Sequence, residues 1–173
     1  MKIKKIIIWF GLFLSVMASG CATSKGLTKE EKAANEAALR EAIENRMFVV
    51  EVDRALPMGG GSRMLTTSYS LEIKGDEVKS YLPYFGRAYS VPYGGGDGLI
   101  FESVMTDYQS SIDKKGILFV SFKTKSKEDQ FVYRIRITPG GYSLIDVTSI
   151  QRQPISFHGK TFIKEENSLE SEK

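Results

Sequence analysis

The stretch FVYRIRITPGGYSLIDVTS, residues 131–149, decides the fold. In its first half, apolar side chains at Phe131, Tyr133, Ile135 and Ile137 occupy every second position, which is the period of a strand with one buried and one solvated face. The Pro-Gly-Gly run at 139–141 supplies a turn, and 142–149 resumes a strand pattern. Because this connection is too short for a crossover helix, the two strands must pair antiparallel.

The same period extends outward along the chain. Six further segments have the alternation or composition of strands, at residues 48–53, 67–74, 77–82, 99–105, 118–122 and 155–162. Turn residues at 57–61, 75–76, 114–116 and 126–129 separate several of them. The sequence therefore predicts an α+β fold that is mainly β, with a seven- or eight-stranded antiparallel meander over 48–163. A sheet of that size twists, and it curls or closes into a partial barrel.

One helix is expected before the meander, over residues 28–47. Thr28 and Glu31 have the spacing of a capping box, and the residues that follow are rich in good helix formers. The apolar stripe of this helix is mostly alanine, so we expect it to bury little area. It would lie on one edge of the domain or act as a spacer, and the β domain would fold without it.

The N-terminus has the layout of a lipoprotein signal. Lysines at positions 2, 4 and 5 precede an apolar run at 6–16, and Ala18-Ser19-Gly20-Cys21 follows. This order favours a signal peptide at 1–20, lipid on Cys21 and a tether at 21–27, over an ordinary secretory peptide with a chance cysteine. Ala22 follows in place of an aspartate that would retain the protein at an inner membrane. We therefore expect a lipid-anchored protein of the outer membrane that faces the periplasm.

Charge and cysteine content change once residues 1–20 are removed. The chain has 24 basic and 21 acidic side chains, and the three lysines of the signal account for the excess. A mature chain without net charge does not favour a nucleic-acid partner. The expected contact with the membrane is the lipid on Cys21. No further cysteine remains for a disulfide or a nucleophile. The mature length suits one domain, followed by a polar tail at 164–173.

Residues 81–98, YLPYFGRAYSVPYGGGDG, break the strand pattern. A loop of this length inside a meander is often functional, and tyrosine offers a flat apolar face with a polar tip. The candidate ligand-binding residues are Tyr84, Phe85, Arg87, Tyr89, Tyr93 and Asp97, together with Arg152. We expect this loop and the Arg152 segment to lie together. The alternative is that the loop covers an open end of the sheet, with its aromatics packed on the core and Arg87 paired with Asp97.

Three blocks of the chain carry a family resemblance. They are LPYFGRAY at 82–89, the glycine-rich run after it, and SIQRQPISFHG at 149–159. They resemble the Bacteroidota lipoprotein family catalogued as domain of unknown function 4251, over roughly residues 48–162. The resemblance implies an envelope lipoprotein. It brings no catalytic residue, because the family has no assigned activity.

Other candidate chemistry is sparse. His158 is the single histidine and reads as a surface residue, and Arg134 and Arg136 read as a solvated strand face. We predict no catalytic residue, no metal site and no cofactor. The function predicted from the sequence is a non-catalytic envelope lipoprotein that binds a small ligand or an envelope protein through its Tyr/Gly-rich loop. The alternative is a structural or assembly lipoprotein that docks onto another envelope component.

Overall fold

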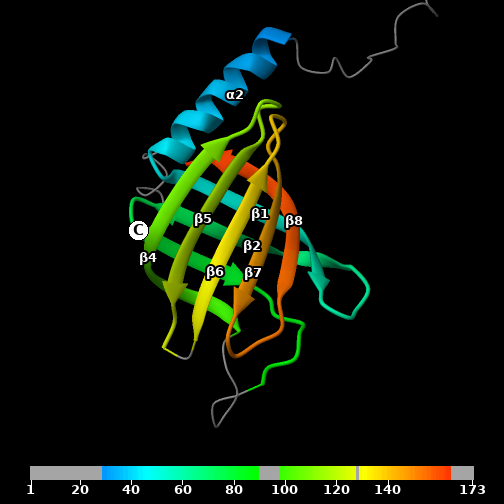
Figure 1. Ribbon diagram of the computed structural model, residues 1–173. Helices are drawn as coiled ribbons and strands as arrows, with labels where there is room; N and C mark the ends of the chain where they lie inside the picture. The colour runs from blue at the N-terminus through cyan, green and yellow to red at the C-terminus, as the bar shows by residue number, and fades with distance from the viewer. Residues whose placement is uncertain (1–28, 90–97, 128, 165–173) are drawn as a thin grey trace, which may run out of the picture.

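The computed structural model describes residues 29–89, 98–127 and 129–164 (Figure 1). These residues form one helix followed by eight strands. The helix is α2 (Lys29–Glu44), and the strands are β1 (Met47–Pro57), β2 (Arg63–Lys74), β3 (Glu77–Leu82), β4 (Leu99–Ile112), β5 (Leu118–Lys125), β6 (Gln130–Ile137), β7 (Tyr142–Ser149) and β8 (Ile155–Ile163). The predicted helix and all eight predicted strands are present, so the expected α+β, mainly β class is confirmed.

The strands form a closed barrel. Each strand pairs antiparallel with the next along the chain, and β1 pairs with β8 from Phe48↔Ile163 to Pro57↔Ile155. Because successive strands run in opposite directions, the connections fall alternately at two ends of the barrel (Figure 1). We call the end with α2 the helix end. The loop end carries the connections that follow β1, β3, β5 and β7.

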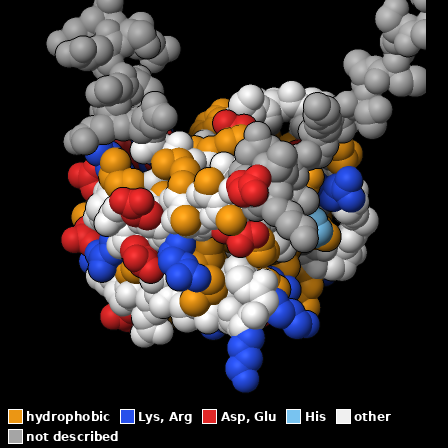
Figure 2. All heavy atoms as spheres, turned by 90° about the horizontal axis from the view of Figure 1, so that it is seen from above, with side chains coloured by type: hydrophobic (Ala, Val, Ile, Leu, Met, Phe, Trp, Pro, Cys, Tyr) orange, Lys and Arg blue, Asp and Glu red, His pale blue; other side chains and the backbone are white. Residues whose placement is uncertain are grey.

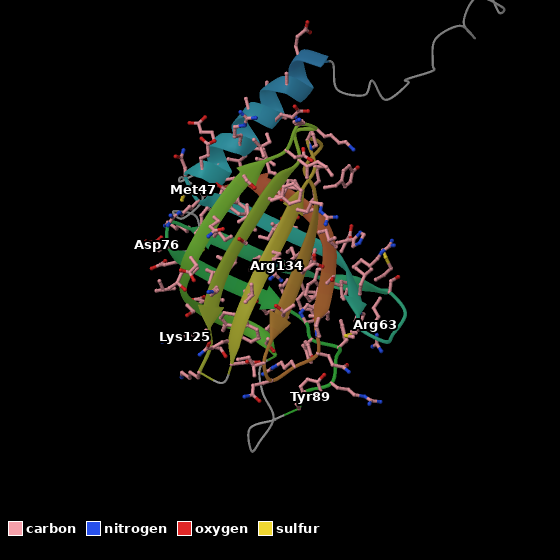
Figure 3. The ribbon with its side chains drawn as sticks, viewed as in Figure 1. Met47, Arg63, Asp76, Tyr89, Lys125 and Arg134 are labelled. Carbon is pink, nitrogen blue, oxygen red and sulfur yellow. The ribbon has the colours of Figure 1, made fainter. Side chains whose placement is uncertain are left out.

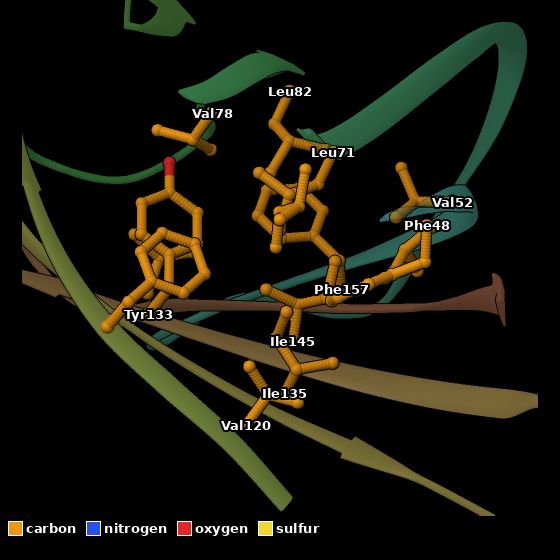
Figure 4. Packing of buried hydrophobic residues seen from close by; sticks show 14 of the residues in the cluster. Phe48, Val52, Leu71, Val78, Leu82, Val120, Tyr133, Ile135, Ile145 and Phe157 are labelled. Carbon is orange, nitrogen blue, oxygen red and sulfur yellow. The ribbon is translucent and has the colours of Figure 1, made fainter. Parts of the chain in front are cut away.

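Inward-facing side chains fill the barrel (Figure 4). The largest buried ones are aromatic, namely Phe48, Phe122, Phe131, Tyr133 and Phe157. The rings of Phe122 and Tyr133 are stacked with their centroids 5.1 Å apart. The Ser80 hydroxyl donates to the Leu99 carbonyl at 2.6 Å, so the Tyr133 hydroxyl, 3.0 Å away, donates to Ser80. The deepest polar atom of the core thus has its hydrogen bond.

Helix α2 packs on the barrel through its C-terminal half. Leu39, Ala42 and Ile43 are buried, and Ile43 is fully so. The Tyr108 hydroxyl donates to the Ile43 carbonyl at 2.7 Å, which satisfies one of the carbonyls at the helix C-terminus. The expectation that this helix buries little is therefore wrong for its last turns, because leucine and isoleucine carry the contact there. No described helix is long and apolar enough to cross a membrane.

Two bulges shape the barrel wall. In β4 the register shifts between Thr106 and Gln109, and Asp107 has φ 55°. This irregularity lies beside Tyr108, which contacts the helix. In β1 the register shifts after Val52, whose partner on β8 is Gly159. A side chain at Gly159 would collide with the Glu51 backbone carbonyl, so only glycine fits this close approach.

Candidate functional site

The segment after β3 crosses the loop end and pairs with the segment after β7. Ala88 forms an isolated antiparallel bridge with Arg152. The Tyr89 amide donates to the Gln151 carbonyl at 2.7 Å, and the Gln153 amide donates to the Arg87 carbonyl at 2.9 Å. The two blocks that the sequence analysis singled out therefore lie side by side, as predicted. The two connections thus form a short antiparallel pairing at the loop end of the barrel.

The Tyr84 side chain contacts both of these paired segments. Its hydroxyl lies 2.9 Å from the Arg87 carbonyl and 3.0 Å from the Gln153 carbonyl, so it joins both segments. Burial raises the pKa of the Tyr84 hydroxyl, and the nearby Arg152 charge opposes that rise. Gly98 has φ 67°, and a Cβ there would lie 3.2 Å from the Tyr84 Cβ. The positive φ at 98 favours glycine, and a larger residue there would also crowd Tyr84.

Arg152 and Asp129 form a buried ion pair at the same end. The two side chains are 7% and 1% exposed, and Arg152 Nε lies 3.6 Å from Asp129 Oδ2. The other carboxylate oxygen accepts the Gln130 amide at 2.8 Å. The Arg152 guanidinium also lies 5.5 Å from the centroid of the Tyr84 ring, within the range of a cation–π contact. A buried guanidinium needs such an anionic partner because burial removes its hydration.

We call Tyr84, Asp129 and Arg152 the loop-end cluster. Its members come from three separate connections, those after β3, β5 and β7. Arg152 was expected beside the tyrosine-rich loop, whereas Asp129 was expected only in a turn and not at the site. One signal was available. In an antiparallel meander, the turns at 126–129 and 150–154 must fall at the same end.

The seven predicted site residues are now divided. Tyr84 is half-buried and Arg152 is buried in the loop-end cluster, whereas Phe85, Arg87 and Tyr89 are exposed beside it. The two arginines are therefore split between a buried and an exposed position. Tyr93 and Asp97 lie outside the described residues, as does the expected pairing of Arg87 with Asp97.

The exposed side chains at this end make a second feature. Tyr89 is 70% exposed and Ile150 is 76% exposed, and both belong to the paired crossing segments. Phe85 is also exposed, and the Arg63 guanidinium lies 4.9 Å from the centroid of its ring. Figure 3 shows Arg63 and Tyr89 toward the same end of the molecule. We call Arg63, Phe85, Arg87, Tyr89 and Ile150 the loop-end surface.

Within the described residues no group of three or more histidine, cysteine, aspartate or glutamate side chains could hold a metal ion. His158 lies exposed on β8, opposite Arg54 of β1. The described part of the chain thus offers binding groups at the loop end rather than a cluster of metal ligands.

Comparisons with known proteins agree with the fold. No curated protein matches the chain. A crystal structure of a DUF4251 family protein from Bacteroides eggerthii is similar, with a TM-score of 0.59 and 16% sequence identity over 76% of this chain and 91% of that chain. The family model described as Domain of unknown function (DUF4251) matches residues 30–161, from α2 into β8. The chain therefore belongs to the DUF4251 family.

Proposed function

We propose that this chain is a non-catalytic lipoprotein of the cell envelope that binds a partner protein through its loop-end surface. Lipid on Cys21 would anchor it in the outer membrane, with the barrel in the periplasm. The observation that carries the proposal is the gathering of exposed aromatic, aliphatic and arginine side chains at one end of the barrel. That end lies opposite α2 (Figure 1).

The position of this surface suits an anchored protein. Helix α2 begins at Lys29, eight residues after Cys21 in the sequence. A lipid on Cys21 would therefore hold the helix end near the membrane and leave the loop end facing away from it. A binding surface at the far end of a tethered domain has the freest access to a partner.

The side-chain chemistry favours a protein partner over a small ligand. Tyrosine, phenylalanine and arginine are enriched where protein surfaces meet, because they combine large contact area with few rotamers and directional hydrogen bonds. Tyr89, Phe85 and Arg87 present these groups outward. The buried loop-end cluster fixes the path of the backbone that carries them, so Tyr84 and Arg152 act as positioning residues.

The experiment is a paired capture measurement. Full-length lipoprotein is cross-linked in intact cells and purified, and the bound envelope proteins are quantified. We expect Arg87→Glu with Tyr89→Asp to reduce the main cross-linked partner at least tenfold, with an unchanged melting temperature. The matched control is Tyr142→Asp, which alters a side chain of similar exposure at the helix end. Unchanged capture by the loop-end variant would contradict the proposal.

A second candidate is the structural or assembly lipoprotein, docking through the helix end. Tyr142, Phe162 and Ile163 are exposed there. Figure 2 views the molecule from this end and shows hydrophobic side chains between acidic and basic ones. The same experiment separates the two candidates. Loss of the partner in Tyr142→Asp, with retention in the loop-end variant, would favour docking through the helix end.

Anchoring is tested on its own. Cys21→Ala removes the acceptor of the lipid, so the variant should appear in the soluble fraction or remain uncleaved. Membrane association and processing that are identical to the wild type would contradict the lipoprotein assignment. This result is independent of the capture measurement, which concerns the other end of the molecule.

A further inference from the structure

The outer face of the barrel is hollowed over β4, β5, β6 and β7. The groove has a volume of about 320 Å³ and is lined by ten residues from these four strands. That volume is at the low end of small-molecule sites, which span about 300–1,000 Å³. The groove lies on the barrel wall, and none of the loop-end surface residues lines it.

The strand register places the groove side chains in two parallel rows. One row runs Gln109, Ser121, Arg134 and Asp146, and the neighbouring row runs Ser111, Phe119 and Arg136. Residues directly opposite on paired strands share one face, so each row is a set of adjacent side chains. The first row is made of hydrogen-bonding groups. The second adds an aromatic ring, with the Arg136 guanidinium 6.0 Å from the centroid of Phe119.

The two arginines in this groove form no ion pair with a described residue. Among the described residues, no carboxylate lies within 4 Å of the Arg134 or Arg136 guanidinium. Asp146 is the register partner of Arg134, yet its Oδ1 accepts the Ser156 hydroxyl. The groove therefore carries two cations and one anion, so its net charge is positive.

A second groove on the barrel provides the contrast. It lies over β2, β3 and β4 and has a similar volume of about 410 Å³. Three basic and three acidic side chains line it, and four of them form ion pairs, Lys79 with Glu102 at 2.6 Å and Lys164 with Glu72. A groove whose charges neutralise one another has little to offer an ion. The groove over β4–β7 differs in that its two cations outnumber its one anion.

We infer that the groove over β4–β7 binds an oligosaccharide that carries carboxylates. Arg134 and Arg136 present planar guanidinium groups that match a carboxylate with two parallel hydrogen bonds. The exposed ring of Phe119 offers a flat surface for the apolar face of a sugar ring. Gln109 and Ser121 supply an amide and a hydroxyl for sugar hydroxyl groups. Groups that can bind a carboxylate, stack on a sugar ring and hydrogen-bond to sugar hydroxyls thus lie side by side in the groove.

Backbone pairing favours a sugar over an acidic peptide. A peptide that binds to a sheet commonly adds as a strand, through main-chain hydrogen bonds at a free edge. The floor of this groove is formed by Phe119 and Ser121 on β5 and by the two arginines on β6, and both strands pair with a neighbour on each side. Their main-chain groups are already used. Recognition must therefore come from side chains alone.

Titration calorimetry of the full-length protein at low ionic strength tests this inference. The probes are trigalacturonate, its fully methyl-esterified form and triglutamate. We expect saturable binding of trigalacturonate, at least tenfold weaker binding of the ester, and at least tenfold weaker binding of trigalacturonate by Arg134→Gln with Arg136→Gln. Phe119→Ala should weaken binding several-fold. The control Lys74→Gln with Lys125→Gln removes the same charge elsewhere and should stay within twofold of the wild type.

Several results would overturn the inference. They are the absence of saturable trigalacturonate binding, equal binding of the ester, retention of binding by the double arginine variant, and triglutamate binding as tight as that of the sugar. If the double variant failed to fold, the comparison of acid and ester on the wild-type protein would still decide. The loop-end variant Arg87→Glu with Tyr89→Asp should bind trigalacturonate normally, because its residues lie outside the groove.

Discussion

At the helix end, the apolar side chains of Leu39, Ala42 and Ile43 cover the barrel, whereas at the loop end a buried arginine and aspartate lie under a tyrosine. Both arrangements exclude water from the same continuous core. They differ in how precisely the contacting groups must be positioned. Hydrophobic contact is non-directional, so a helix can settle on the barrel with some freedom of position. A buried ion pair has no such freedom, because each partner alone is a charge without hydration.

This difference explains which end can present a defined surface. The loop-end cluster ties three connections to one another through side chains and main-chain carbonyls. The exposed residues of the loop-end surface therefore stand on a backbone whose path is fixed. At the helix end the Tyr108 hydroxyl donates to the Ile43 carbonyl, and the ion pair of Arg46 with Asp76 is exposed rather than buried.

The largest effect is expected from removing one member of the ion pair. Arg152→Ala leaves the Asp129 carboxylate buried without its counterion, and breaking a buried pair in this way costs about 3–5 kcal/mol. Urea unfolding followed by circular dichroism measures the loss. The control Arg87→Ala removes an exposed arginine of the same segment and should change the free energy of unfolding by less than about 0.5 kcal/mol. Similar small values for both variants would remove the distinction between the ends.

A smaller loss is expected at the helix end. Ile43→Ala opens a cavity beneath α2, and because a helix at the barrel end can partly close that space, we expect about 2–3 kcal/mol. Ile150→Ala, at an exposed position of the loop end, serves as the control for the lost side chain.

A chain that begins at Arg46 should still melt cooperatively, at a lower temperature than the wild type. Loss of cooperative melting would show that α2 is an essential part of the core.

The smallest effect concerns Tyr108 and is pH-dependent. Burial raises its pKa to about 12, against the nearby Arg46 charge, which lowers it. Since the pKa is higher in the folded than in the unfolded chain, the stabilisation is complete below about pH 10 and is lost as pH rises toward 12. Tyr108→Phe should remove about 1 kcal/mol at neutral pH, the value of one hydrogen bond. It should also reduce the alkaline loss of stability, measured as the urea midpoint against pH, and an unchanged alkaline slope would contradict this.

The strands could be predicted because their signal is local. The alternation from Phe131 to Ile137 needs only neighbouring residues to be seen, and the short turns then impose antiparallel pairing. Full closure could not be predicted in the same way. It depends on the pairing of β1 with β8, and Phe48 and Ile163 are too far apart in the sequence for any local pattern to join them. The sequence therefore predicted a curled or partial barrel where the barrel is closed.

The candidate site shows the same division. The unusual composition of residues 81–98 marked the loop, and we expected it beside Arg152 because these are the two most distinctive blocks of the chain. The composition around Asp129 gave no comparable signal, because an aspartate in a polar turn is ordinary, and turn alternation indicated only that its turn and the Arg152 turn share one end. Burial converts that ordinary residue into the counterion of a buried guanidinium. Burial is a property of the assembled barrel, so it is seen only after the three connections meet.

A double-mutant cycle on the loop-end ion pair tests the central claim most directly. The variants are Arg152→Met, Asp129→Leu and the two combined, with free energies of unfolding taken from urea titrations. If the pair holds the loop end closed, each single variant leaves one buried charge uncompensated, and the double variant removes both. We therefore predict that the double variant loses at least about 2 kcal/mol less stability than the sum of the single losses. Losses that add to within about 0.5 kcal/mol would show that the two side chains act independently, and would contradict the account.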